Sequence, residues 1–351
     1  MRGHDSRVHA DCKNDHRPEE PQDHQLRPAP AELLACNAPI KPLYDLGVEI
    51  EENSELDLFE AFNKHEGDPR IPKVVEDMEK ELGKGNMKPE ILPKLAQYEI
   101  TLLDWVEDHR GYREYVAIAG KCWPAFQTQF GFVPCYVNSR LTGMGIPVSC
   151  EVDIYGALSE FIGTCVSLDA VTLLDINNTV PADLYNSDIK GKTTYTQKDT
   201  FMGFHCGNTP SCKMCSDRAV KYQLIQHRLL EPAGSDPDFT RGTLEGDIAP
   251  SDITFYRLQC DSEGQLRAYI AQGEILPVAT RSFGGIAIFA IPEMGRFYRH
   301  VLIQKRYPHH GAVAFGHYGK TLFEVFKFLG IADIAYNQPK SLPYPTENPF
   351  A

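Results

Sequence analysis

The sequence lacks any apolar stretch of the roughly 20 residues that a membrane-spanning helix needs. Its N-terminus also lacks the short hydrophobic segment of a secretory signal. Basic residues are not in excess, because 35 lysines and arginines stand against 48 acidic residues, for a formal net charge of −13. This balance disfavours nucleic acid and anionic membrane surfaces as partners. We therefore expect a cytoplasmic protein with no membrane partner and no nucleic-acid partner.

The ten cysteines do not form the closely spaced pattern of a disulfide-rich domain. Several lie within apolar runs, as Cys135, Cys150 and Cys165 do, which indicates reduced and buried thiols. One cluster leaves an alternative open, namely a zinc-stabilised interaction module. Its four candidate ligands are His205, Cys206, Cys212 and Cys215. A single C-x-x-C without a second one is a signal of low specificity for zinc.

Composition divides the 351 residues into three parts. Residues 1–37 begin with a stretch rich in His, Asp, Arg, Pro and Gln, and this predicts a disordered tail. Residues 38–165 alternate helical patterns with short apolar runs, which predicts an α/β domain with a doubly wound, Rossmann-like layer. Residues 166–351 carry short alternating runs, which predict a mainly antiparallel β-barrel-type domain with few helices.

Local signals locate several turns and helix ends. Ser54 and Asp57 have the spacing of a capping box at the start of a helix. Asp153 is placed to cap a second helix, which we expect to stop near Gly163. Residues 261–264 read Asp-Ser-Glu-Gly between two alternating runs, which predicts a hairpin turn.

Two acidic residues end short apolar runs on either side of that second helix. Glu151 follows the run that contains Val148 and Cys150, and Asp175 follows the run over residues 170–174. Open α/β sheets carry their chemistry at the ends of neighbouring strands, so the two carboxylates are candidates for one site. The alternative is that both acids cap helices or pair with surface Arg and Lys.

Adjacent histidines stand in the segment 308–317. Because neighbouring residues of a strand face opposite sides, we expect at most one of His309 and His310 to be a metal ligand. Both can also be ordinary turn histidines. Taken with Glu151 and Asp175, one or two imidazoles make a mixed oxygen and nitrogen site, which suits Mn²⁺, Mg²⁺ or Fe²⁺. A metal beside two carboxylates is suited to moving a proton next to a carbonyl group.

The segments 147–153, 174–175 and 309–317 resemble the L-fucose isomerase family, which is related to L-arabinose isomerase. The resemblance covers residues from about 38 to 345, corresponding to the family's middle and C-terminal domains. It implies that Glu151, Asp175 and His310 bind Mn²⁺, or another divalent cation such as Mg²⁺. It also implies that Glu151 and Asp175 transfer the proton through an enediol. His205 is the better of two candidates for a further metal ligand, and His309 is an additional candidate for metal or substrate.

The resemblance implies an aldose-ketose isomerase that acts on L-fucose or a similar monosaccharide such as D-arabinose or L-arabinose. We also expect a homo-oligomer, because in the family a neighbouring subunit's N-terminal domain closes the sugar pocket. That domain precedes the equivalent of Leu43 and has no counterpart here, so the chain is expected to be a truncated form. The alternative is a non-catalytic carbohydrate-binding or regulatory remnant of the same fold. His309 stands where the fucose enzyme has Asn, which leaves the sugar open.

The resemblance also leads to an electrostatic expectation. Two carboxylates at one site repel each other, so we expect at least one of Glu151 and Asp175 to have a raised pKa until a metal binds.

Overall fold

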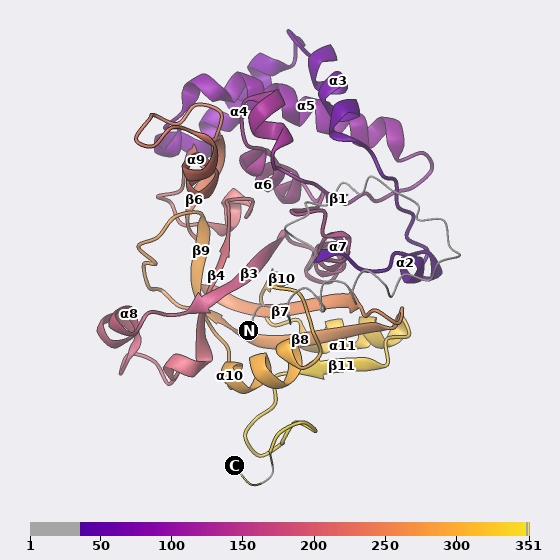
Figure 1. Cartoon of the computed structure of the whole chain (residues 1–351), viewed down its shortest axis with the longest axis vertical. Helices are drawn as coiled ribbons and strands as arrows, with labels where there is room; N and C mark the ends of the chain where they lie inside the picture. Colours follow the sequence, from indigo (N-terminus) through magenta and orange to yellow (C-terminus); the bar gives the residue numbers. More distant parts are fainter. Residues whose placement is uncertain (1–35, 349, 351) are drawn as a thin grey trace, which may run out of the picture.

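The computed structural model describes residues 36–348 and residue 350 (Figure 1). Almost all of the tail predicted over residues 1–37 therefore lies outside the described residues. A helical region comes first in the chain, and a large β-sheet follows it. Figure 1 shows α3, α4, α5 and α6 gathered at the top of the molecule, above one end of the sheet, and α2 at the side near α7.

The helical region is held together by an aromatic core. Its elements are α2 (Lys41–Asp45), α3 (Glu55–Lys64), α4 (Ile71–Leu82), α5 (Leu92–His109), a π-helical turn over Phe126–Phe130, and α6 (Cys135–Gly143), with 3-10 turns at Gly83–Gly85 and Pro89–Ile91. The rings of Phe62, Tyr98, Phe126, Phe130 and Phe132 pack against one another. Ser54 and Asp57 form the predicted capping box at the start of α3.

The helical region contains one short parallel pair of strands, β1 (Ile118–Ala119) with β2 (Val148–Ser149). The Rossmann-like layer predicted over residues 38–165 is not confirmed. The run after β2 that was expected to extend a parallel layer is β3 (Val171–Thr179), and it pairs antiparallel within the large sheet. Residues 171–174 are buried on both faces of the sheet, and a periodicity argument cannot distinguish such a run from a parallel strand.

The large sheet has nine strands in the order β11-β8-β7-β10-β3-β4-β9-β6-β5. The remaining strands are β4 (Thr200–His205), β5 (Ala219–Tyr222), β6 (Arg241–Asp247), β7 (Ser251–Cys260), β8 (Leu266–Ile275), β9 (Gly285–Ala290), β10 (His310–Phe315) and β11 (Asp333–Tyr336). Neighbours are antiparallel except in the β11–β8 and β6–β9 pairs. Strand β8 also pairs with β9, so the sheet bends back on itself. The mainly antiparallel C-terminal part is thus confirmed, and a closed barrel stays a prediction.

Helices cover both faces of this sheet. On one face α7 (Ile154–Ser167) and α11 (Gly319–Phe328) pack Ile162 and Phe326 against Tyr256 and its neighbours. On the other face α10 (Met294–Phe297) and the π-helical turn Tyr298–Ile303 pack against β8. The smaller elements are α8 (Ala182–Leu184), the turn Tyr185–Ile189, the 3-10 turns Gln197–Asp199 and Ser211–Lys213, and α9 (Leu224–Leu230).

Helix α7 is longer than predicted. It continues past Gly163 to Ser167 and ends at Leu168, whose φ is 53°. A side chain at Gly163 would collide with the hydroxyl of Tyr256. This glycine therefore allows the helix to approach the sheet closely and does not stop the helix. The other local predictions hold, because Asp153 caps α7 and residues 261–264 turn between β7 and β8.

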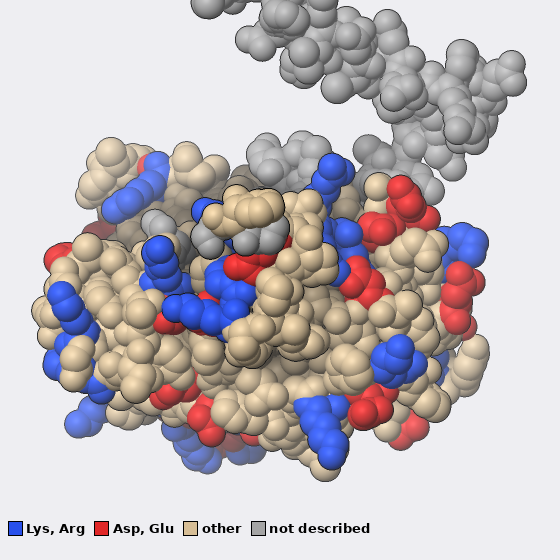
Figure 2. All heavy atoms as spheres, turned by 90° about the horizontal axis from the view of Figure 1, so that it is seen from below, with Lys and Arg blue, Asp and Glu red and all other residues tan. Residues whose placement is uncertain are grey.

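The described surface carries both signs of charge. Figure 2 shows Lys and Arg side chains interspersed with Asp and Glu on the face seen from below. Within residues 36–348 and residue 350, every helix is too short or too polar to cross a bilayer.

Candidate metal centre

Strand register brings Asp175 and His310 together. The two residues lie directly opposite each other on β3 and β10, so their side chains project to the same face. Asp175 Oδ1 lies 3.1 Å from His310 Nε2. His205 ends the next strand, β4, and its ring centroid lies 5.7 Å from that of His310. One donor atom from each of the three residues lies within 4.8 Å of the others.

Glu151 reaches the same point from a strained turn between β2 and α7. Glu151 and Val152 have φ values of 62° and 54°, a left-handed conformation that costs a non-glycine residue on the order of 1–3 kcal/mol. The Val152 N–H donates to the Gly120 carbonyl at 3.1 Å and holds the turn. Glu151 Oε2 lies 3.6 Å from His310 Nε2. Glu151 and Asp175 therefore meet at one imidazole nitrogen.

His309 also faces the two carboxylates. Its Nε2 lies 3.2 Å from Glu151 Oε2 and 3.7 Å from Asp175 Oδ1. The expectation that His309 and His310 could not both face one point is wrong. Strand β10 begins at His310, so His309 belongs to the preceding turn and the alternation of a strand does not constrain it.

Asp153 fixes the orientation of the His310 ring. Its Oδ2 accepts the Nδ1–H of His310 at 2.8 Å, and both its oxygens accept from Arg257 at 2.7 Å. The side chains of all three residues are fully buried. The bond to Nδ1 leaves Nε2 directed toward the acids, which is how carboxylates orient metal-binding histidines. Sequence reasoning found only the capping role of Asp153, although its position two residues after Glu151 was a signal.

Two buried atoms at this point have no hydrogen-bond partner within the described part of the chain. They are His310 Nε2 and Asp175 Oδ1, which face each other at 3.1 Å as a close polar contact but not as a hydrogen bond of regular geometry. Leaving a buried polar atom without a partner costs about 1–3 kcal/mol. A divalent cation held between a neutral imidazole nitrogen and carboxylate oxygens would satisfy both atoms. The residues present therefore fit a metal ion.

The histidines reverse the expected electrostatics of the acid pair. Burial alone would raise the pKa of Glu151, but His309, His310 and His205 outweigh it and lower that pKa. Burial alone would also raise the pKa of Asp175. His310 above all, together with His205 and His309, outweighs burial and lowers that pKa. The expectation of a raised carboxylate pKa is wrong, because three imidazoles surround the two acids.

Glu160 is a further buried acid that sequence reasoning missed. It lies on α7 with 1 % of its surface exposed, and its Oε2 has no hydrogen-bond partner among the described residues. Burial raises its pKa to about 8. The carboxyl group is therefore largely protonated at neutral pH. Its position in the apolar pattern of the helix gave no sign of this.

The thiolate cluster considered from the sequence does not come together. His205 lies with Asp175 and His310, and Cys206 Sγ accepts a hydrogen bond from Gln223 Nε2 at 3.0 Å. Cys212 is exposed. Among the described residues, two groups of side chains have metal-binding spacing, and neither includes Cys206, Cys212 or Cys215.

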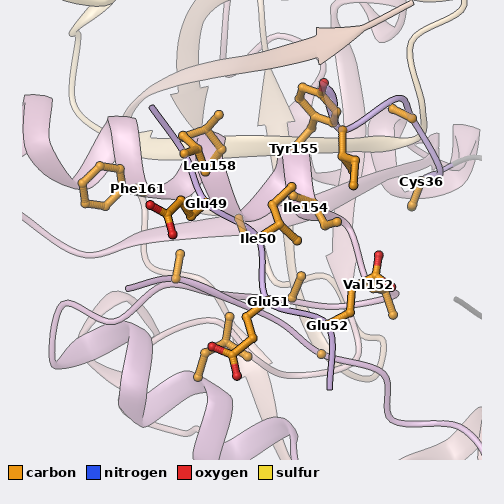
Figure 3. A pocket seen from close by; sticks show the side chains of 18 of the residues that line it. Cys36, Glu49, Ile50, Glu51, Glu52, Val152, Ile154, Tyr155, Leu158 and Phe161 are labelled. Atoms are coloured by element: carbon orange, nitrogen blue, oxygen red, sulfur yellow. The ribbon is translucent and has the colours of Figure 1, made fainter. Parts of the chain in front are cut away.

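A cleft of about 1,800 Å³ reaches the chain neighbours of Glu151 and His309. Its walls come from the extended segment 47–55, the end of α5, helix α7 and the β7–β8 hairpin. Figure 3 shows Cys36, Val152, Ile154 and Tyr155 along it. Cys36, Val152 and Pro308 line the cleft, and the last two are chain neighbours of Glu151 and His309. Charged side chains of both signs also line it. The cations are Arg110, Arg113, Lys121, Arg267, Lys305 and Arg306, and the acids are Glu49, Glu51, Glu52, Glu55, Glu114, Asp261 and Glu263.

Comparison with known proteins agrees with the resemblance seen in the sequence. Residues 203–336 match the family model of the L-fucose isomerase C-terminal domain. The chain is also similar to the sulfoquinovose isomerases of Priestia aryabhattai and Priestia megaterium, with 25% identity over 83% of this chain and 58% of each relative. The sulfoquinovose isomerase of Alkalicoccus urumqiensis is 23% identical over 79% of this chain and 56% of the relative. The chain thus spans somewhat more than half the length of these relatives.

Proposed function

We propose that this protein is a metal-dependent aldose-ketose isomerase, or the catalytic portion of one, that acts on a monosaccharide. One observation carries the proposal, the convergence of Glu151, Asp175 and His310 on a point where two buried atoms make no regular hydrogen bond within the described residues. The likeness to sugar isomerases supports the reaction class.

The metal ligands in this proposal are Glu151, Asp175 and His310, with His205 or His309 as a further ligand or a substrate contact. A bound Mn²⁺ or Mg²⁺ supplies charge that polarises the sugar carbonyl and hydroxyl oxygens. Histidines on β4, on β10 and before β10 surround the two acids, and Asp153 keeps the His310 ring in one orientation.

Glu151 and Asp175 transfer the protons. Isomerisation through an enediol requires a base that removes a proton from one carbon and returns it to the next. Both carboxylates have lowered pKa values, so they are ionised and able to act as bases at neutral pH. The nearby cleft is large enough for a monosaccharide and is lined by Cys36, Val152 and Pro308, the last two being chain neighbours of Glu151 and His309.

We propose that the sugar is either neutral, such as L-fucose, D-arabinose or L-arabinose, or sulfonated, as the names of the relatives suggest. The cleft wall carries acids as well as cations, and Arg267 and Arg306 are its cations without an ion pair among the described residues, so a sulfonate would bind there. Three of the other cations, Arg113, Lys121 and Lys305, are already paired with Glu49, Glu55 and Asp333.

The proposal also includes a cytoplasmic location, a homo-oligomer and a barrel-type C-terminal part. A second candidate function is a carbohydrate-binding or regulatory protein of the same fold. We keep this second candidate because the chain matches 58% of the length of the Priestia aryabhattai enzyme.

The test is turnover of sulfoquinovose, L-fucose, D-arabinose and L-arabinose with added Mn²⁺, together with incorporation of solvent deuterium followed by NMR. Glu151→Gln and Asp175→Asn are each expected to lower kcat by at least about 1,000-fold and to weaken Mn²⁺ binding, because each removes both a base and a ligand. Asp183→Asn on α8 is the matched control, since Asp183 is exposed and lies outside the two groups of metal-binding spacing.

Near-normal turnover by Asp175→Asn would contradict the role of this acid. Binding of Mn²⁺ and sugar by the wild-type protein, without deuterium exchange for any of the four sugars, would favour the carbohydrate-binding alternative.

A further inference from the structure

Cys36 places a thiol beside the metal centre. Its Sγ lies 3.7 Å from Glu151 Oε2 and 3.5 Å from His310 Nδ1, and only 3% of its surface is exposed. The segment that carries it is anchored to α7, because Tyr155 donates a hydrogen bond to the Pro39 carbonyl at 2.6 Å. The thiol is thus held at the site by the fold.

Four donor atoms surround one point here. Donor atoms of Cys36, Glu151, His309 and His310 all lie within 4.8 Å of one another. Glu151 Oε2 is 3.7 Å from the sulfur, 3.2 Å from His309 Nε2 and 3.6 Å from His310 Nε2. A tetrahedral ion with ligands at roughly 2.0–2.3 Å has donor atoms about 3.3–3.8 Å apart. The three distances from Glu151 fit that geometry.

The buried nitrogen of His310 that supports the metal centre also faces this point. His310 is completely buried, and its Nε2 has no hydrogen-bond partner among the described residues. The thiol contacts His310 at Nδ1, which Asp153 also binds, so Nε2 is the His310 atom left for an ion. The free nitrogen and the thiol are both available to an ion beside Glu151.

We propose that Cys36, Glu151, His309 and His310 form a second, overlapping site for a thiophilic divalent ion such as Zn²⁺. One thiolate, one carboxylate and two imidazoles are a tetrahedral zinc set. The donors Asp175 and His205 lie outside this set and serve a hard ion such as Mn²⁺. On binding, the sulfur–metal bond forms and the thiol proton leaves to solvent, so no oxidant or reductant is needed.

The two sites exclude each other, because both use Glu151 and His310. Four protein donors fill a tetrahedral ion and leave no position for a sugar oxygen. Zn²⁺ at this site therefore blocks the isomerase proposed above. The zinc site itself depends only on the position of the donors and would exist even if the chain had no isomerase activity.

The test uses Co²⁺ as a spectroscopic probe on the full chain. Wild-type protein is expected to show a thiolate-to-cobalt charge-transfer band and tetrahedral d–d bands. Cys36→Ser is expected to lose the charge-transfer band and to bind Zn²⁺ at least about 100-fold more weakly by competition with a chelating dye. Its Mn²⁺ affinity, measured by EPR, is expected to stay within about twofold, because the hard-ion set does not include the sulfur.

Cys165→Ser is the matched control, since Cys165 is an exposed thiol on α7. It is expected to keep both the cobalt spectrum and the Zn²⁺ affinity. A wild-type cobalt spectrum without the thiolate band would overturn the proposal, even if the Cys36 variant did not fold. A band that persists in Cys36→Ser would overturn it as well. Failure of sugar turnover or of Mn²⁺ binding would contradict the isomerase and leave the zinc site standing.

Discussion

Two buried charged clusters in this molecule differ in whether their charges are balanced. In the helical region Arg140 of α6 bridges Glu81 of α4 and Glu99 of α5, and Tyr136 donates a hydrogen bond to Glu81. At the metal centre Glu151 and Asp175 face histidines, and two buried atoms have no hydrogen-bond partner in the described chain. Both clusters join separate segments, yet only the first one is complete.

This difference separates a structural cluster from a binding cluster. A buried ion pair with its hydrogen bonds made gives little reason to expect a ligand. A buried group of donors with free atoms gives a strong reason, since the cost of leaving them unpaired is otherwise not offset. Asp153 has both a structural and a binding role. Its two oxygens pair with Arg257, and one of them also orients the ring of His310.

The largest effect is expected at Asp153, because its ion pair with Arg257 supports the metal centre through His310. Asp153→Asn would leave the buried guanidinium of Arg257 without its counter-charge and is expected to lower the free energy of unfolding by about 3–5 kcal/mol. It is also expected to weaken Mn²⁺ binding by about 10–100-fold, because His310 loses its orienting carboxylate. Urea unfolding and EPR titration of the folded fraction measure the two effects. Unchanged Mn²⁺ affinity would show that Asp153 is only structural.

Arg140→Met is expected to separate stability from metal binding. It leaves Glu99, of which 2% is exposed, without its partner and should lower the free energy of unfolding by about 3 kcal/mol. Mn²⁺ affinity of the folded protein should not change, because the Arg140 cluster shares no residue with the metal centre. Arg228→Met on α9 is the control, since this side chain is exposed. Weaker metal binding in Arg140→Met would mean that the two clusters are coupled.

Glu160→Gln is expected to have the smallest effect and to depend on pH. The folded protein holds the Glu160 proton up to a pKa of about 8, against an ordinary value of 4.5. The unfolded chain releases that proton earlier, so stability falls as pH rises from about 4.5 toward 8. The amide removes this loss. The variant should be more stable than wild type near pH 8, and equal to it near pH 4.5.

Urea unfolding in EDTA at several pH values measures this difference. Glu324→Gln on α11 is the control, because Glu324 is exposed and its substitution should leave the pH profile unchanged. A Glu160→Gln variant that tracked wild type at every pH would show that the carboxyl group is solvated in solution.

Local signals were sufficient for much of the fold. The capping box at Ser54, the cap at Asp153 and the turn at residues 261–264 each depend on a few neighbouring residues, and the structure has all three. The pairing direction of the strands in the predicted parallel layer could not be inferred from neighbouring residues. Whether the run at residues 171–179 pairs parallel or antiparallel depends on partners more than 20 residues away in the chain.

The candidate site was predictable only as a set of segments. Glu151, Asp175 and His310 were recognisable from their segments, but their proximity depends on the β3–β10 register. The part played by His309 depends on where β10 begins, which is uncertain by a residue or two in any sequence-based assignment. Cys36 was missed because it precedes the first periodic segment and reaches the centre only through tertiary packing.

The left-handed turn at Glu151 and Val152 makes metal affinity depend on the rest of the fold. The carboxylate is aimed before any ion arrives, so the ion does not have to order the turn when it binds. The ordering is provided by the contact of Val152 with Gly120 and by the packing of β2 and α7. A substitution that loosens this packing would release the turn and lower the affinity for the ion, even though every ligand remained in the sequence. Variants with weak metal binding are therefore to be sought around β1, β2 and α7 as well as among the donors.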